Sequence, residues 1–338
     1  MPGSPTRRAA SPATRLGHPV LDRYLEFVEA RARRNTLLAT ASDLRIFFTT
    51  VDREPADVMV DDVLAFITEQ RRPVSDPKII RLRDGESGLS ATTIKRRLSS
   101  VSGLFSYLVM TGEREANPVP RGLATRRSRR AKGALVPLVR APRTLPKILE
   151  PAEVDALIAA LRRWRDRAMV EAMVLGGLRR CEVLGLRIED LRPGEGRVFV
   201  RDGKGGHQRL VPISARFFRS VAAYLSTERP PQATTDQLFV VLKGPRRGQP
   251  LSEDGLDEIV RYTRVRIGLS HGTCHELRHT CLTRLREAGM ALEAIQAQAG
   301  HRSLETTRIY LHLSNEWLAD EYARAISLLD TEALAVAQ

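Results

Sequence analysis

Apolar side chains recur with helical spacing through the N-terminal third of the chain. One face starts near Pro19, and similar faces follow over residues 37–51 and from residue 60 onward. Ser90 is placed to cap a further helix, which we expect to continue as far as the Asn117-Pro118 step. The apolar stripe of that helix comprises Ile94, Leu98, Val101, Phe105 and Leu108. These segments predict an all-helical bundle of roughly 100 residues, which is large enough to fold alone.

The pattern changes in the second half, where two strand-like runs interrupt the helices. Helical spacing extends from residue 151, over 166–175 and, after a Gly176-Gly177 break, over 178–186. Residues 197–200 and 208–213 flank the segment 202–206, Asp-Gly-Lys-Gly-Gly, which predicts a β-hairpin. A short apolar run follows at 238–242, and helical spacing returns from residue 256. We therefore predict a mainly α fold, with a small β-sheet in a mixed α/β C-terminal domain.

A basic segment separates the two halves. Residues 121–149 contain prolines at 137, 142 and 146 but no acidic residue, which predicts an extended linker that buries no core. Residues 72–88, rich in Pro, Asp, Gly and Arg, predict a long loop. The predicted organisation is a disordered basic tail (1–17), a helical domain (18–120), the linker (121–149), a mixed α/β domain (150–330) and a C-terminal tail (331–338).

Charge narrows the range of partners. The formal net charge is +14, and such an excess favours an anionic polymer. Charged residues interrupt every long apolar stretch and no signal peptide is visible, so we expect a cytoplasmic protein without a membrane partner. For the charges on the helix after Ser90 the alternative is a solvated face, and for the linker it is a solubilising spacer. The residues that we expect to contact a nucleic-acid backbone are Lys95, Arg96, Arg97, Arg126, Arg127, Arg129, Arg130 and Lys132.

The cysteines do not indicate a disulfide framework. Cys181, Cys274 and Cys281 are odd in number, which suits a reducing compartment. The last two lie among three histidines in the sequence, but the spacing matches no familiar zinc-ligand pattern. We predict small buried cysteines and no metal site.

One set of residues in the second half is suited to chemistry on a phosphate. Breaking a phosphodiester without a metal requires fixed cations against the non-bridging oxygens, and arginine offers two donors in a rigid fork. The nucleophile must lose a proton and the leaving 5′ oxygen must gain one. The candidates for these tasks are Arg179, Lys204, His275, Arg278, His301 and Tyr310.

In order and spacing, these residues resemble the tyrosine recombinase family, also called the phage integrase family. The resemblance covers residues 150 to about 325. Residues 177–187 (GLRRCEVLGLR) are similar to the family's first arginine motif, and residues 275–279 (HELRH) are similar to its histidine-arginine motif. The segment 299–301 (AGH) and the later Tyr310 complete the match. The sequence departs from the usual residues of these motifs at Cys181 and at Gln298-Ala299, and neither departure falls on a catalytic position.

The resemblance implies a role for each matched residue. The reaction would pass through a 3′-phosphotyrosyl enzyme, with no cofactor. By this resemblance Tyr310 is the nucleophile, and Arg179, Arg278 and His301 hold the phosphate. Glu182 steadies Arg179. His275 moves a proton at the nucleophile, and Lys204 protonates the leaving oxygen.

The resemblance also implies partners. It indicates double-stranded DNA with inverted half-sites, a dimer on each site and a homotetramer on two duplexes, in association with the nucleoid. It leaves open whether accessory proteins take part. The amphipathic segment 313–329 either packs on its own domain or docks on a neighbouring protomer.

Three functions remain open at this stage. The first is a site-specific recombinase acting in integration, transposition or resolution of chromosome dimers. The second is a topoisomerase of the tyrosine type, which would relax DNA as a monomer, and the third is a non-catalytic DNA-binding protein. A complete catalytic set favours an enzyme over the third.

Overall fold

The protein is described from a computed structural model, which covers residues 15–72, 88–122, 138–140, 147–201 and 208–300. Contacts divide the chain into two compact units, Met1–Arg143 and Thr144–Gln338. The division falls inside the basic segment predicted as a linker.

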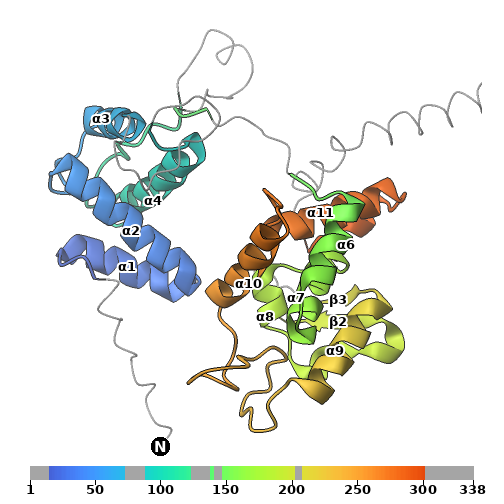
Figure 1. The fold of residues 1–338 in the computed structure, drawn as a ribbon. Coiled ribbons are helices and arrows are strands. Elements are labelled where there is room, and N and C mark those ends of the chain that lie inside the picture. Colours follow the sequence, from blue (N-terminus) through green and yellow to red (C-terminus); the bar gives the residue numbers. More distant parts are fainter. Residues whose placement is uncertain (1–14, 73–87, 123–137, 141–146, 202–207, 301–338) are drawn as a thin grey trace, which may run out of the picture. The chain divides into compact units, whose positions relative to one another are not determined.

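The first unit is a bundle of four described helices (Figure 1): α1 (Pro19–Arg31), α2 (Arg34–Val51), α3 (Val60–Arg71) and α4 (Ala91–Met110). Helix α2 packs against the other three. As predicted, Ser90 caps α4, where its hydroxyl accepts the Thr93 amide hydrogen at 3.2 Å. All five residues of the predicted α4 stripe are buried. The helical pattern therefore identified the core-facing side of α4.

Two expectations for this unit are wrong. Helix α4 ends at Met110 instead of at Asn117, because Gly112 takes a left-handed φ of 76° that the helix cannot continue through. Asn117 folds back instead, and its amide donates to the Ser102 carbonyl at 3.0 Å.

The segment 121–149 also contributes to cores: Val139 is buried in the helical bundle and Leu149 in the second unit. The basic composition of the segment predicted no buried residues, but its apolar side chains Val139 and Leu149 are buried.

Phe47 is expected to be the residue on which the first unit depends most strongly. It is fully buried and packs edge-on against Phe66 and Phe105, with ring centroids 5.0 and 6.5 Å away. Phe47→Ala should therefore lower the unfolding free energy of this unit by about 3–5 kcal/mol. Phe48→Ala is the matched control, because the neighbouring ring is only partly buried. Far-ultraviolet circular dichroism during denaturation measures the loss; equal losses in both variants would contradict the assignment of Phe47 as the centre of the core.

The second unit is mainly helical with one small sheet. Its helices are α6 (Pro151–Ala160), α7 (Trp164–Val174), α8 (Arg180–Leu184), α9 (Ala215–Thr227), α10 (Glu253–Arg266), α11 (Cys274–Glu287) and α12 (Leu292–Ala299), with short 3₁₀ turns at Ile188–Asp190 and Pro193–Glu195. The strands are β1 (Leu191–Arg192), β2 (Arg197–Val200) and β3 (Arg209–Pro212). The predicted fold class is confirmed.

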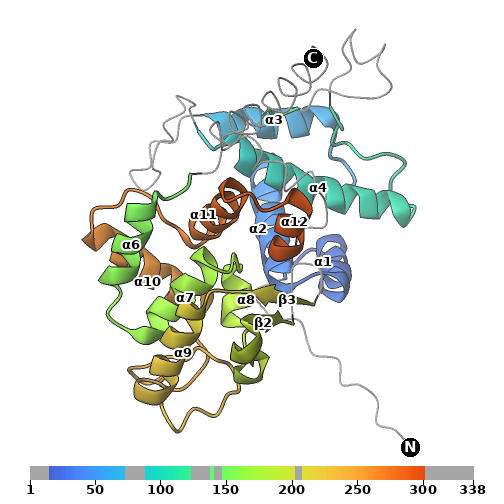
Figure 2. The same ribbon diagram turned by 90° about the vertical axis from the view of Figure 1, so that its right-hand side faces the viewer.

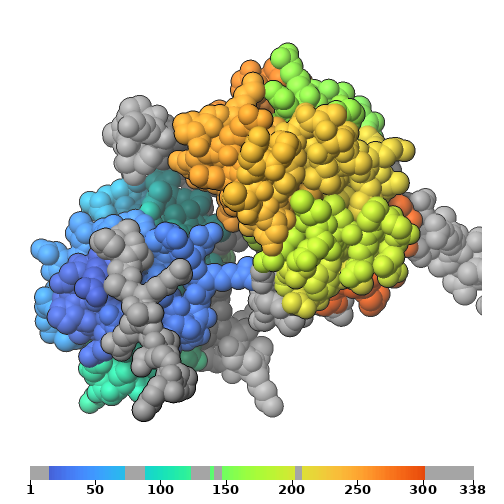
Figure 3. All heavy atoms as spheres, turned by 90° about the horizontal axis from the view of Figure 1, so that it is seen from below, coloured from blue at the N-terminus to red at the C-terminus, as the bar shows by residue number. Residues whose placement is uncertain are grey.

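Helix α7 is the centre of this unit. Its residues from Ala168 to Val174 are all buried, and it packs against α9 and α11. Residues 215–266, drawn in yellow to orange, form a large part of the face of this unit that Figure 3 shows. Helix α9 was not predicted, although Ser214 caps it and its residues Phe217, Val221 and Tyr224 have helical spacing.

The predicted hairpin is present as the antiparallel pair of β2 and β3, with Val198 opposite Val211. Its turn, with Lys204, lies outside the described residues. Strand β1 extends the sheet by pairing Leu191 with Val198. Among the residues described, no helix is long and apolar enough to cross a bilayer.

Candidate active site

The first candidate arginine lies where a glycine turn enters a short helix. Gly177, at a left-handed φ of 66°, turns the chain out of α7, and Arg179 then precedes the five-residue helix α8. Glu182 accepts the Arg179 backbone amide hydrogen at 2.9 Å and a guanidinium hydrogen at 2.8 Å. Arg179 and Glu182, three residues apart, therefore form an ion pair, which fixes the direction of the Arg179 guanidinium.

Two more arginines converge on the same carboxylate. Arg209 of β3 donates from Nη1 and Nη2 to the two Glu182 oxygens, at 3.0 and 2.9 Å. Arg278 of α11 is 3% exposed and brings Nη1 to 3.8 Å from Glu182 Oε2. Three positive charges therefore surround one negative charge, which leaves two positive charges in excess. Arg209 was not among the predicted residues; its only signal was a charged residue at the start of a strand.

The three arginines also hold the end of α12. The last carbonyls of a helix lack intrahelical partners, and cations are favourable there. Here the Gln298 carbonyl accepts from Arg209 at 3.2 Å, the Ala299 carbonyl from Arg278 at 2.6 Å, and the Gly300 carbonyl from Arg179 at 3.3 Å. Arg278 also donates to the Gly177 carbonyl. Figure 2 shows α8, α12 and β3 next to one another.

Gln298 is a second residue that the sequence did not single out for a role. Its side chain is buried, and its amide donates to the Gly176 carbonyl at 2.9 Å and to the Pro212 carbonyl at 3.0 Å. Its signal was the departure of Gln298-Ala299 from the pattern that the sequence resembles. The amide thus ties α12 to the turn after α7 and to the end of β3.

Glu182 remains charged although its side chain is inaccessible to water. Burial raises the pKa of the carboxyl, but hydrogen bonds and charge from Arg209, and then those from Arg179, outweigh burial and hold the pKa below its ordinary value. The carboxylate therefore stays available to orient the arginines at neutral pH.

The two histidines of α11 lie on its first turns. Thr273 and Glu276 cap the helix reciprocally, since the Glu276 carboxylate accepts the Thr273 amide hydrogen at 2.7 Å and the Thr273 hydroxyl accepts that of Glu276 at 3.3 Å. The His275 and His279 rings meet edge to face, with an Nε2 to Nε2 distance of 2.8 Å. Burial, then the charges of Arg278 and Arg179, lower the pKa of His275. A neutral imidazole beside the arginines is able to accept a proton.

His279 should make the second unit less stable in acid. Burial, followed by the charges of His275 and Arg278, lowers its pKa to about 4. Because the unfolded chain takes up this proton near pH 6.5, stability is fully present above that value and falls as the pH approaches 4. Wild type should lose about 2 kcal/mol more than His279→Gln between pH 7.5 and pH 5. Both tryptophans, Trp164 and Trp317, belong to this unit, so their fluorescence during urea unfolding reports its unfolding free energy. Equal losses of stability in wild type and His279→Gln would refute the role of His279.

Three predicted catalytic residues, Lys204, His301 and Tyr310, lie outside the described residues. The described chain ends at Gly300, whose carbonyl accepts from Arg179. The structure therefore brings together Arg179, Glu182, Arg278 and His275, and it fixes the residue that precedes His301.

The predicted DNA-contacting residues on α4 differ in their surroundings. Lys95 and Arg96 are exposed, and Arg96 forms an ion pair at 2.6 Å with the buried Asp43. Arg97 is half-buried and donates to Gln70. The remaining predicted contacts, Arg126, Arg127, Arg129, Arg130 and Lys132, lie outside the described residues.

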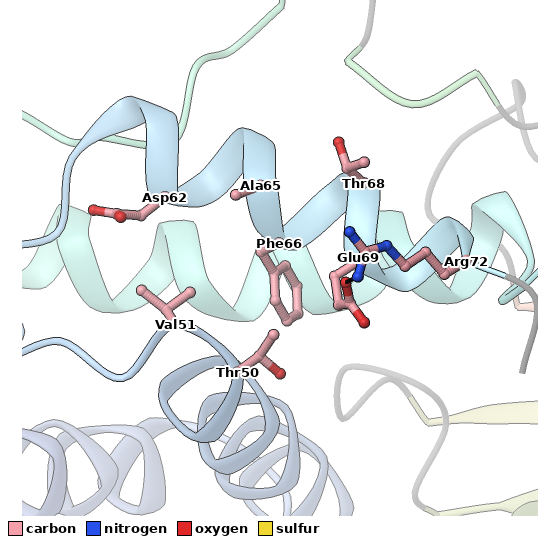
Figure 4. Close-up of a pocket in the computed structure, with 8 residues that line it drawn as sticks. All are labelled: Thr50, Val51, Asp62, Ala65, Phe66, Thr68, Glu69 and Arg72. Atoms are coloured by element: carbon pink, nitrogen blue, oxygen red, sulfur yellow. Dashed lines mark ion pairs between the residues drawn. The ribbon is translucent and has the colours of Figure 1, made fainter.

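A pocket of about 510 Å³ opens between α2 and α3, with the Phe66 ring at its centre (Figure 4). Its carboxylates are already paired: Asp62 lies 2.9 Å from Arg53, and Glu69 lies 2.7 Å from Arg72. Acidic groups at this surface do not suit a phosphate backbone.

None of the three cysteines, all of which are described, forms a disulfide. Cys274 and Cys281 are buried as predicted, and burial raises the pKa of each to about 12. Cys181 is exposed, so the prediction of a buried cysteine is wrong there. In the part of the chain that the structure describes, no three histidine, cysteine or acidic side chains are grouped to hold a metal ion.

Known proteins share this architecture. Residues 147–316 match the model of the phage integrase family. The tyrosine recombinase XerC of Thermodesulfovibrio yellowstonii is 31% identical over 301 residues, covering 86% of this chain and 90% of the relative. XerC of Vibrio atlanticus is 34% identical over 247 residues, covering 70% and 73%.

Solved structures agree in fold. The Tn1549 transposon integrase in complex with transposon right end DNA has a TM-score of 0.66 at 18% identity, covering 91% of this chain and 99% of that one. A lambda integrase dimer bound to a COC′ core site has a TM-score of 0.63 at 18% identity, covering 88% and 95%. Fold and sequence thus define an enzyme that breaks and rejoins DNA by the tyrosine mechanism. The chain belongs to the phage integrase family.

Proposed function

We propose that this site-specific recombinase cleaves DNA with Tyr310 as the nucleophile and with Arg179 and Arg278 as the phosphate clamp. The observation that carries the proposal is the convergence of both arginines on buried Glu182, with a surplus of positive charge. Fixed cations of this kind stabilise the charge that grows on the non-bridging oxygens in the transition state.

The chemical steps follow from the groups available. The Tyr310 oxygen bonds to phosphorus while the bond from phosphorus to the 5′ oxygen breaks. His275 moves the phenolic proton, His301 donates to a phosphate oxygen, and Lys204 protonates the leaving oxygen. A 5′-hydroxyl of a second duplex then attacks the phosphotyrosine and reverses the step. The energy of the phosphodiester is kept in the covalent link.

The substrate is proposed to be duplex DNA with two inverted half-sites, bound by a dimer. The net charge of +14 supports an anionic partner, and among the structural neighbours the lambda integrase is a dimer on its core site. Two such dimers would form a tetramer that exchanges strands between two duplexes. Relatives named XerC favour a two-duplex recombinase over a monomeric topoisomerase.

Covalent capture tests this function and selects the target site in the same experiment. The protein is incubated with nicked duplexes that carry a randomised core, so that the cleaved fragment diffuses away and the enzyme stays attached. We expect complexes that survive denaturation, with a 3′-phosphate on tyrosine, and enrichment of inverted repeats. A 5′ attachment, or no attachment anywhere in the library, would overturn the proposal. Adding a second selected duplex then separates strand exchange from relaxation.

A further inference from the structure

Arg209 is a nearly buried arginine at the start of β3. Its side chain is 12% exposed, and all three of its guanidinium nitrogens donate hydrogen bonds. Nη1 and Nη2 bind the two oxygens of Glu182, and Nε binds the Gln298 carbonyl. A planar fork that meets a carboxylate in this two-point way fixes the plane of the carboxylate as well as its position.

The orientation of the Glu182 carboxylate determines the positions of Arg179 and Arg278, which both contact it. The Oε1 atom that accepts from Arg209 also accepts from Arg179, and Oε2 accepts from the Arg179 amide and faces Arg278. A carboxylate free to rotate would change both contacts together. Displacement of a catalytic group by about 1 Å costs roughly 10² in rate. The orientation of the clamp therefore depends on a residue outside it.

Gly300 gives an independent sign that Arg209 belongs to the centre. The glycine has a left-handed φ of 60°, and a β-carbon there would lie 2.9 Å from Arg209 Nη1 and 3.0 Å from its Cζ. The guanidinium therefore packs directly against the backbone that precedes His301. One side chain thus joins the sheet, α8 and the end of α12.

We propose that Arg209 is a positioning residue of the catalytic centre, which acts through Glu182 and the end of α12 instead of on DNA. All three guanidinium nitrogens of Arg209 donate within the protein, and both Nη atoms bind the same carboxylate, so its contacts are those of a group that orients Glu182. The inference rests on the proposed function, because its main readout is DNA cleavage.

The test compares full-length variants on one nicked duplex obtained by covalent capture with wild type. In single-turnover cleavage, Arg209→Gln should lower the rate constant about 10²-fold, while DNA affinity stays within about twofold of wild type. Arg209→Lys, which keeps the charge but lacks the fork, should fall between the two. Arg197→Gln, at an exposed arginine on β2 of the same hairpin, is the matched control and should cleave at the wild-type rate.

Misfolding and positioning are separated by two readouts. A misfolded fraction lowers the amplitude of the cleavage reaction but leaves the rate constant unchanged. In a double-mutant cycle, Arg209→Gln should cost much less in the Glu182→Gln background than it costs alone, because both substitutions remove the link between Arg209 and Glu182. A normal rate constant, a loss confined to amplitude or to DNA affinity, or multiplying rate effects in the double variant would each overturn the role of Arg209. Failure of wild type to attach to DNA would instead overturn the proposed function, and this inference with it.

Discussion

Replacing Tyr310 with phenylalanine is expected to abolish covalent attachment to DNA. The substitution removes one oxygen and keeps the ring, so the chain loses its proposed nucleophile while the arginine cluster on Glu182 is unchanged. DNA affinity should stay near the wild-type value, because the phosphate contacts come from arginines and lysines. Denaturing gels of the protein with captured nicked duplex measure the attachment, and a gel-shift titration measures affinity.

The matched control for this experiment is Tyr322→Phe. The residue is another C-terminal tyrosine of the same unit, and it has no role in the proposed chemistry. This variant should attach to DNA at the wild-type rate. Equal attachment by Tyr310→Phe and wild type would exclude Tyr310 as the nucleophile, and peptide mapping of the trapped DNA would then identify the residue that attacks.

Local patterns predicted local features correctly. Ser90 was recognised as a cap because capping depends on a side chain and the amide three residues later. The pairing of Arg179 with Glu182 was implied by the resemblance, and it is a contact between residues within one turn. The strands β2 and β3 followed from two strand-like runs around a glycine-rich turn. Each of these depends on residues that are neighbours in sequence.

Features that depend on distant residues were missed. Nothing near Arg209 in the sequence reveals that it meets Glu182, because the contact forms only when β3 lies against α8. Val139 belongs to a basic, proline-rich segment, yet it is buried, because it packs into the core of the helical bundle. The early end of α4 depended on the conformation of one glycine, Gly112. A glycine within an otherwise helical pattern is a weak signal, so the Asn117-Pro118 step was preferred.

Arg278→Lys should be nearly as damaging to cleavage as loss of the side chain, although it keeps the charge. Arg278 is 3% exposed and donates from separate nitrogens to the Gly177 and Ala299 carbonyls, while Nη1 also faces Glu182. A lysine has one nitrogen on a flexible stem and cannot reproduce this fork. We expect the single-turnover cleavage rate to fall about 10²–10³-fold, the range for losing one transition-state donor.

The same substitution should also destabilise the second unit. A buried carbonyl that loses its donor costs about 1–3 kcal/mol, and tryptophan fluorescence during urea unfolding will measure that loss. Arg284→Lys, at an exposed position of the same helix, is the control and should change neither quantity. Because a rate constant does not depend on the amount of folded enzyme, the two effects are separable. A normal cleavage rate constant in Arg278→Lys would show that positive charge alone suffices at this position. The two-pronged geometry of the Arg278 guanidinium would then have no part in the phosphate clamp.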